Sequence, residues 1–330
     1  FKQKTAYEIR NCDWSSDVCS SDLVALLLTG CATSPRPRAV PFIAQEPNYC
    51  GPAALAMVAN YYGHAVTQDQ IADKIYLPSV QGVLTAELAD YARHFQLWTR
   101  QYRGDWRDLQ QKTRAGIPLI VLGRFGDNWH YFVVLDAGDE VIAHSGTQSA
   151  QHIRADDFRR WWERANRWTL LVCPPERATW KLSADEHNDL GVFLEKLDRL
   201  DEAARHYEAA GADFNLGNIR LKQHRYAEAA ALFAKFPDNP DALNNLAWTY
   251  HEMGDRLDEA AALCRRAIEL RPTQSAYYLD TLGSVFLKQG KKVDAIAAFK
   301  AALKATTDRQ SALRVAIQGR LAAARALAEK

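Results

Sequence analysis

One cysteine of the chain stands in a context suited to nucleophilic chemistry. In "QEPNYCGPAALAMVANYYG", residues 45–63, Cys50 directly precedes Gly-Pro and an apolar pattern. The apolar residues recur at helical spacing and predict a mostly buried helix. Pro52 suits a first turn, where its missing N–H costs nothing. Cys50 would then lie at the helix N-terminus, where the partial positive charge of the helix favours a thiolate.

A thiol nucleophile needs a base, a group that orients the base, and donors for the oxyanion. His130 is the candidate base, because it opens the strand pattern "WHYFVVLD". Strand alternation places His130 on the same face as Phe132 and Val134. Taken alone, His130 could also be a histidine at a sheet rim, bonded to a loop carbonyl.

The other cysteines and histidines give weaker signals. Cys173 ends an apolar strand pattern and Cys264 lies on an apolar helix face, so both are predicted to be core residues. His144, His152 and Asp156 lack the spacing of a metal site. We therefore predict neither a metal nor a cofactor.

The elements that position Cys50 and His130 follow from patterns between residues 41 and 175. Helices first and an antiparallel sheet second make an α+β domain. Besides the helix that starts at Cys50, the patterns predict helices over residues 67–76, 85–96, 105–116 and 155–165, and strands over 97–102, 117–123, 129–136, 140–146 and 167–173.

From about residue 176 the strand signals vanish, and Ala, Leu, Glu and Arg dominate. A sequence pattern of Gly, Ala, an aromatic residue and Ala, in that order, recurs at the period of tetratricopeptide repeats. The clearest copy contains Gly283 and Phe299, and others follow Gly191 and Gly217. The small residues would let paired helices approach closely. Residues 311–330 would form a capping helix, and a generic helical bundle is the alternative.

The beginning of the chain is interpreted separately. Residues 1–23 have no apolar period and place acidic residues where a secretory signal needs basic ones. They resemble translated sequencing-adapter read-through and are excluded from the fold. Residues 24–31 form a truncated apolar signal ending in "LTGC", which resembles the lipobox of bacterial lipoproteins, and residues 32–40 form a tether. That resemblance implies acyl chains on Cys31 and an anchor in the outer membrane, facing the periplasm.

Composition limits the remaining possibilities. The 330 residues have room for two domains, and a net charge of +1 with 25% charged residues gives no global field for nucleic acid. The sequence lacks a run of eighteen apolar residues, so we predict no transmembrane helix.

Two motifs in order resemble a known family. Gln45 with "CGPAAL" from Cys50, followed by "HYFVV" from His130, resembles the papain-like cysteine peptidases of the bacteriocin-processing, or double-glycine, group. The resemblance spans residues 41 to about 172. It implies a Cys50 nucleophile and a His130 general base and acid. It also implies an oxyanion hole made by the Gln45 side-chain amide and the Cys50 N–H, and cleavage after a Gly-Gly pair.

The third member of the expected triad departs from the family. Relatives usually carry Asp or Asn on the strand after the histidine, whereas Asp136 lies too far along the strand from His130. A two-residue hairpin turn would bring Ser145 opposite His130, and a four-residue turn would bring Thr147 there. Either hydroxyl could fix the ring, but it would stabilise an imidazolium less than a carboxylate would.

These patterns predict an α+β papain-like cysteine peptidase domain over residues 41–175, followed by an all-α tetratricopeptide-repeat solenoid over 176–330. The leading hypothesis is a membrane-anchored cysteine peptidase that acts on a peptide or protein substrate and binds a protein partner through its repeats. The alternative is a catalytically weak or inactive scaffold lipoprotein. A transferase or amidase that uses the same thiol is a third hypothesis, since an acyl-enzyme does not fix the acceptor.

Overall fold

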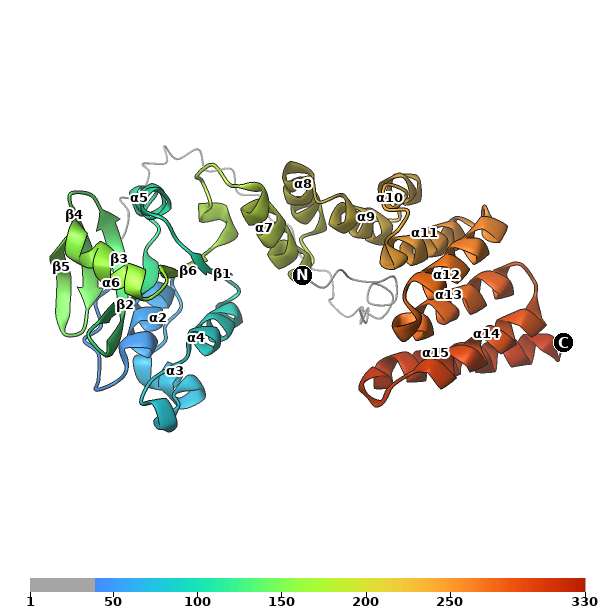
Figure 1. The fold of residues 1–330 in the computed structure, drawn as a ribbon, viewed down its shortest axis with the longest axis horizontal. Coiled ribbons are helices and arrows are strands. Elements are labelled where there is room, and N and C mark those ends of the chain that lie inside the picture. Colours follow the sequence, from blue (N-terminus) through green and yellow to red (C-terminus); the bar gives the residue numbers. More distant parts are fainter. Residues whose placement is uncertain (1–38, 330) are drawn as a thin grey trace, which may run out of the picture. The chain divides into compact units, whose positions relative to one another are not determined.

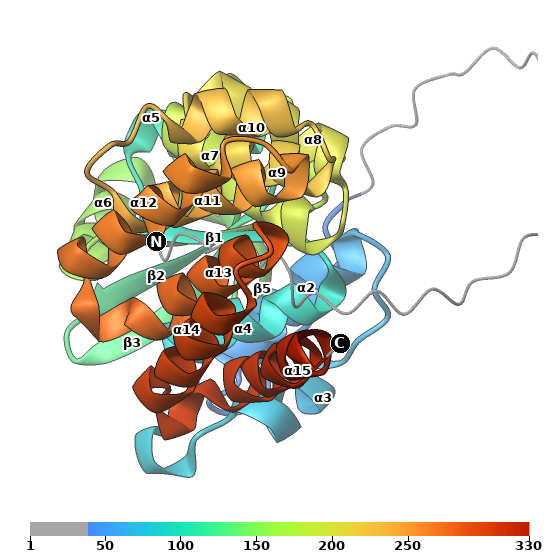
Figure 2. The same cartoon turned by 90° about the vertical axis from the view of Figure 1, so that its right-hand side faces the viewer.

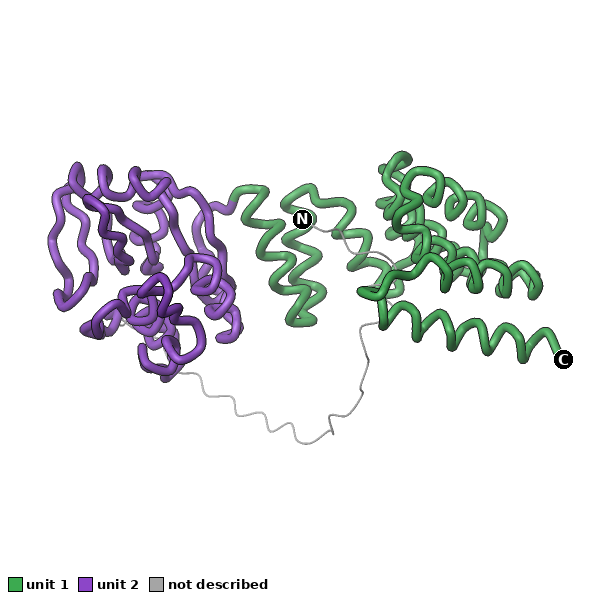
Figure 3. The backbone as a smooth tube through the Cα atoms, turned by 60° about the horizontal axis from the view of Figure 1, so that its bottom comes forward, with its two compact units in different colours: residues 1–23, 183–330 green, residues 24–182 purple. Residues whose placement is uncertain are grey.

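The computed structural model describes residues 39–329. They divide between Leu182 and Ser183 into two compact units (Figure 3), a few residues after the domain boundary expected at residue 175. The interpretations of residues 1–38, including the lipidation of Cys31, lie outside the described residues.

The first unit is built around a six-stranded antiparallel sheet in the order β1-β6-β2-β3-β4-β5 (Figure 1). The strands are β1 (Trp98–Arg103), β2 (Leu119–Phe125), β3 (Asn128–Ala137), β4 (Glu140–Ser145), β5 (Gln148–Arg154) and β6 (Trp168–Cys173).

Three helices cover one face of this sheet. They are α2 (Cys50–Tyr61), α3 (Gln68–Ile75) and α4 (Thr85–Ala92). Their buried side chains share one core with alternate residues of the central strands, among them Ile120 of β2 and Val133 of β3. Burial of nine consecutive residues of α2 makes it the central helix of the unit.

The opposite face carries α6 (Ala155–Arg164), with α5 (Trp106–Arg114) beside it. Phe158 and Trp161 of α6 pack against Phe132 of β3, with ring centroids 6.0 and 6.4 Å away. Phe158 and Trp162 belong to the core, because they are 1% and 2% exposed.

One strand, β5, was missed by the sequence patterns. Its residues are mostly exposed and polar, with only Ile153 buried. β5 forms because the chain turns back after β4 and pairs with it from Glu140 to Ser145. Backbone hydrogen bonds to the neighbouring strand stabilise an edge strand of this kind. Its sequence therefore need not alternate between apolar and polar residues.

The second unit contains helices only, which follow one another in antiparallel pairs to α15 at the end of the stack (Figures 1 and 2). They are α7 (Ala184–Lys196), α8 (Leu200–Ala210), α9 (Asp213–Lys222), α10 (Tyr226–Phe233), α11 (Pro240–Met253), α12 (Leu257–Leu270), α13 (Ser275–Lys288), α14 (Lys292–Ala305) and α15 (Ser311–Ala328).

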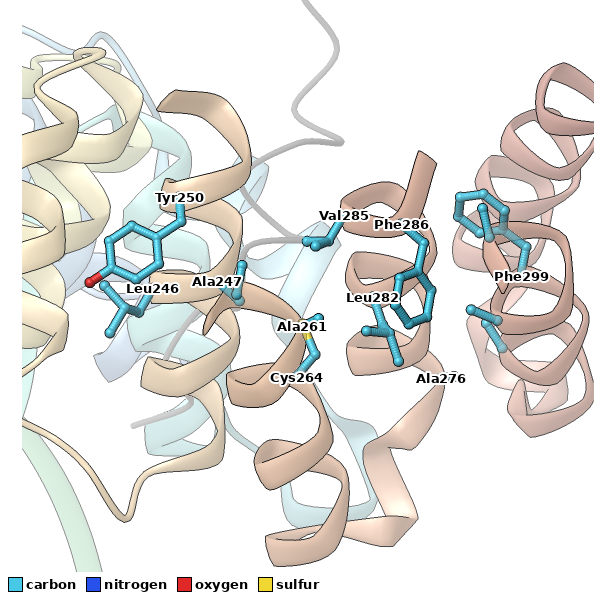
Figure 4. Packing of buried hydrophobic residues seen from close by; sticks show 14 of the residues in the cluster. Leu246, Ala247, Tyr250, Ala261, Cys264, Ala276, Leu282, Val285, Phe286 and Phe299 are labelled. Carbon is cyan, nitrogen blue, oxygen red and sulfur yellow. The ribbon is translucent and has the colours of Figure 1, made fainter. Parts of the chain in front are cut away.

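Within a helix pair, a small residue on the first helix faces a large one on the second. A Cβ placed on Gly283 would lie 2.7 Å from ring carbons of Phe299, and Gly191 and Gly217 meet aromatic rings in the same way. In the pair α11–α12, Ala247 replaces the glycine, and the small Cys264 belongs to the same buried cluster (Figure 4).

The last helix is fixed by charge as well as by apolar packing. Arg320 of α15 makes two hydrogen bonds, of 2.7 and 2.8 Å, to the fully buried carboxylate of Asp280 on α13. A buried carboxylate needs such a partner.

Among residues 39–329, no helix has the length and apolarity to cross a bilayer.

Replacing Gly283 with alanine should lower the free energy of unfolding by about 1–3 kcal/mol, because the new methyl group overlaps Phe299. Thermal unfolding of the full chain followed by circular dichroism measures this change. Gly319→Ala in α15 is the control: nothing lies within 4 Å of its Cβ, so it should stabilise the chain by up to about 1 kcal/mol. Equal effects of the two substitutions would contradict the packing described here.

Candidate active site

Cys50 is the first residue of α2, and Pro52 lies in the first turn, as the sequence predicted. The residue before it, Tyr49, makes no side-chain cap, and the first turn contains no acidic residue. The N–H groups at this helix end are therefore not taken up by a capping side chain.

Gly51 brings the start of α2 directly against β3. A Cβ on Gly51 would lie 3.3 Å from two ring carbons of Tyr131, which is tighter than most side-chain contacts. The Tyr131 ring also contacts Trp168, and its hydroxyl donates to the Val83 carbonyl at 3.3 Å. Tyr131 is thus held on three sides and fixes the distance between α2 and β3.

The Cys50 sulfur interacts with the strand that carries the candidate base. It accepts a hydrogen bond from the backbone N–H of Tyr131, the residue after His130, and also interacts with the N–H groups of Gly51 and Cys50. Cys50 and His130 are both half-buried, so a substrate can reach this end of β3.

His130 lies in an aromatic environment and contacts the side chain expected to orient it. Its ring centroid is 4.9 Å from that of Phe132 and 6.2 Å from that of Phe125. The Ser145 hydroxyl lies 3.1 Å from Nε2 of the ring. A hydroxyl contact to Nε2 leaves Nδ1 as the nitrogen for a different partner.

Next to His130 the β3–β4 register is the one predicted for the four-residue turn, and a bulge separates it from the pairs nearer the hairpin turn. Val133 pairs with His144 and, beyond a bulge, Asp136 pairs with Ile142. The bulge shifts the strands by one residue. Ser145, the last residue of β4, therefore does not face His130 directly but reaches its ring from the strand end.

Burial sets the protonation of both groups. It lowers the pKa of His130 to about 4 and raises the pKa of the Cys50 thiol, an effect that the nearby backbone N–H groups only partly offset. The expected thiolate is therefore not the resting form. At a largely desolvated helix end, the cost of burying a charge exceeds the stabilisation from the helix dipole. At rest the Cys50 thiol and the His130 imidazole are therefore both expected to be neutral.

A tight turn lies between Gln45 and Cys50. The Tyr49 N–H donates to the Glu46 carbonyl at 3.0 Å, with Pro47 and Asn48 at the corner. Asn48 has a φ of 65°, and this combination of proline and a left-handed residue is typical of a type II turn.

Three consecutive residues at the end of β4 hold the segments of the site. His144 is 4% exposed and accepts from the Ala150 N–H through Nδ1, so Nε2 carries the proton and donates to the Val40 carbonyl at 3.1 Å. Ser145 contacts His130, and the Gly146 carbonyl accepts from the Gln45 N–H at 3.1 Å. The roles of His144 and Gly146 were not foreseen, because they depend on backbone groups of distant segments.

A cavity of about 420 Å³ lies in the first unit, lined by residues that include two neighbours of Tyr131. Trp168, which contacts the Tyr131 ring, and Leu122, which pairs with Tyr131, both line it. Arg103 and Asn166 add polar groups to its wall.

Residues 38–171 match the family model described as the Peptidase_C39 like family. The first unit is a Peptidase_C39-like domain. Residues 214–275 match the tetratricopeptide repeat model. The predicted α+β peptidase fold and the predicted repeats are thereby confirmed. No curated protein matches the chain.

Solved structures similar to the chain come from peptidases. The peptidase domain of Streptococcus ComA, a bi-functional ABC transporter involved in a quorum sensing pathway, is 21% identical over 40% of this chain and 96% of that one, with a TM-score of 0.36. A C39-like peptidase from Bacillus anthracis is 17% identical over 41% and 94%, with a TM-score of 0.37. A double glycine motif protease from an AMS/PCAT transporter, in complex with the leader peptide, is 25% identical over 43% and 96%, with a TM-score of 0.35.

Iodoacetamide should label Cys50 of the C39-like domain slowly below pH 7, at a rate that still rises through pH 9. Burial raises the pKa of this thiol above its ordinary value, so nearly all molecules carry it protonated at pH 7. Cys173 and Cys264 are fully buried and should label only on unfolding. Mass spectrometry of the alkylated peptides measures all three rates. Fast labelling of Cys50 at pH 6 would instead indicate a thiolate–imidazolium pair.

Replacing Ser145 with aspartate should raise the pKa of His130 by about one to three units, because a carboxylate next to the ring stabilises the imidazolium. The pKa of about 4 in the parent and its rise in the variant are measured by NMR titration of the ring protons. Ser149→Asp, at an exposed position of β5, is the control and should leave the midpoint unchanged. An unchanged midpoint in Ser145→Asp would refute the contact between these side chains.

Proposed function

We propose that this protein is a membrane-anchored cysteine peptidase whose repeat unit binds a peptide or protein partner. The observation that carries the proposal is the hydrogen bond between the Cys50 sulfur and the backbone of β3 at Tyr131, next to His130. Because Ser145 contacts Nε2 of His130, we assign Nδ1 to the sulfur. The C39-like domain supports a peptide substrate.

The proposed reaction begins with a neutral Cys50 thiol and a neutral His130 imidazole. As the sulfur attacks the carbonyl carbon of the scissile peptide bond, the thiol proton passes to His130, and the resulting oxyanion accepts from the Cys50 N–H and the Gln45 side-chain amide. The His130 imidazolium then donates its proton to the leaving amine, leaving a thioester. With a pKa near 4, the imidazolium is a strong acid for this step. Water, deprotonated by His130, hydrolyses the thioester and regenerates the thiol.

The substrate and the location are further parts of the proposal. The resemblance to double-glycine peptidases favours a peptide cut after a Gly-Gly pair, since small residues fit a narrow cleft. The tetratricopeptide match over residues 214–275 supports a second binding surface for an extended peptide or a protein. The lipobox-like sequence ending at Cys31 supports a lipid anchor in the cell envelope, in the outer membrane facing the periplasm.

A scaffold function is the second candidate, and the electrostatics of the site favour it. Proton transfer from a thiol with a raised pKa to an imidazole with a pKa near 4 is uphill in the resting site. Ser145 offers a hydroxyl where a carboxylate would stabilise the imidazolium. In this function the C39-like domain binds a peptide without cleaving it, and the protein acts mainly by binding a partner through its repeats. Transfer of the acyl group to an amine instead of water is the third candidate.

Peptides containing a Gly-Gly pair should be cleaved by the protein, and Cys50→Ala should abolish the cleavage. His130→Ala should reduce kcat/KM by about 10²–10⁴-fold, the usual contribution of a general base. Mass spectrometry identifies the products, and an added amine shows whether the acyl group is transferred. Cys173→Ala is the matched control, because Cys173 is fully buried at the end of β6 in the same unit. Binding of the peptides without any product, equal in wild type and Cys50→Ala, would favour the scaffold.

A further inference from the structure

Gln68 is a buried polar residue on an otherwise apolar stripe. The buried residues of α3 are Gln68, Ile71, Ala72 and Ile75, which recur at the spacing of one helix face. Gln68 is 8% exposed. A buried amide must find hydrogen-bond partners, and those of Gln68 lie on a segment far away in the sequence.

The partners of Gln68 are the backbone groups on either side of Gln45. Its Nε2 donates to the Ala44 carbonyl at 2.9 Å, and its Oε1 accepts from the Glu46 N–H at 3.0 Å. The Gln45 N–H, which belongs to the same peptide group as the Ala44 carbonyl, donates to Gly146 at 3.1 Å.

These three hydrogen bonds fix both peptide planes that meet at the Cα of Gln45. Because peptide groups are planar, fixing the two planes fixes φ and ψ of Gln45 and therefore the direction in which its side chain leaves the backbone. The side chains of Ala44 and Glu46 are exposed, so core packing of the flanking side chains does not hold the segment.

We call the three hydrogen bonds that fix Gln45 the clamp. The segment that carries Gln68 is connected to α2, the helix that carries Cys50. Asn60, near the end of α2, donates to the Ala56 carbonyl in its own helix and to the Val66 carbonyl just before α3, both at 2.7 Å. Thr67 then caps α3 through a capping box with Gln70. Gln68 and Cys50 are thus positioned by one frame made of α2 and α3.

We propose that Gln68 is a positioning residue of the active site, which aims the side-chain amide of Gln45 at the oxyanion. This inference rests on the proposed peptidase function. It adds a residue that touches neither the substrate nor the reacting atoms. Precise placement matters here because an oxyanion donor acts only when it is held at the position where charge develops.

The test compares Gln68→Met with Gln70→Met in the full chain. Methionine keeps the volume of Gln68 but loses both hydrogen bonds. Gln70→Met removes the capping box of the same helix and leaves the clamp intact, so it controls for destabilisation of α3. Two quantities are measured: kcat and KM on a Gly-Gly peptide, and hydrogen exchange of the backbone amides of residues 45 and 46.

Gln68→Met should lower kcat by about 10–100-fold with KM unchanged, because loss of an oxyanion donor reduces turnover by about 10²–10³-fold and misplacement costs part of that. Exchange at residues 45 and 46 should accelerate in this variant and not in Gln70→Met. Unchanged exchange would overturn the clamp, and faster exchange with normal kcat would overturn its role in turnover.

A wild-type protein without activity refutes the proposed function and with it any role of Gln68 in turnover. The exchange measurement then still decides whether Gln68 holds the Gln45 segment. Equal loss of kcat in both variants would overturn the inference in favour of a general effect of α3 stability.

Discussion

The approach of α2 to β3 is the constraint on which the rest of the site depends. Gly51 lets the ring of Tyr131 pack against the first turn of the helix, and the backbone N–H of the same tyrosine reaches the Cys50 sulfur. Because α2 is buried along most of its length, its position is set by the core and not by the site. Cys50 is therefore held where packing of the whole unit places it.

The burial that fixes this geometry also determines the chemistry of the site. The aromatic rings of Phe125 and Phe132 surround His130, and desolvation lowers its pKa to about 4. The same cause raises the pKa of Cys50. The hydroxyl of Ser145 orients the ring without adding a charge. An active enzyme with this pair would work as a neutral thiol–imidazole system, in which the proton moves only as the sulfur attacks.

Segments far apart in the sequence converge on this end of β3 through backbone contacts. The end of β4 holds Val40, His130 and Gln45 through three successive residues, and Gln68 holds Gln45 from the other side. Such contacts use main-chain atoms that every residue possesses. A network of this kind can position reactive side chains precisely while it leaves little trace in residue types.

The repeat unit follows a simpler rule. Gly283 with Phe299, and Gly217 with Phe233, show that a small residue on one helix makes room for a large side chain on the paired helix. Because these contacts are local and repeat along the chain, the sequence pattern alone predicted them. The repeat period and the small-to-large pairing can therefore be recognised in the sequence alone.

The sequence by itself determined the two fold classes, most helices and strands, and the residue types of the site, because periodicity and turn residues act locally. Cys50 at the start of its helix, and His130 near the start of its strand, were among these predictions. Tertiary structure alone decided the β3–β4 register, the edge strand β5, the contacts of Gln45 and the protonation of Cys50 and His130. Each of these features depends on what surrounds a residue in space. No local sequence pattern encodes a bulge, the pairing partner of a strand, a hydrogen bond to a distant amide or the loss of water around a charged group.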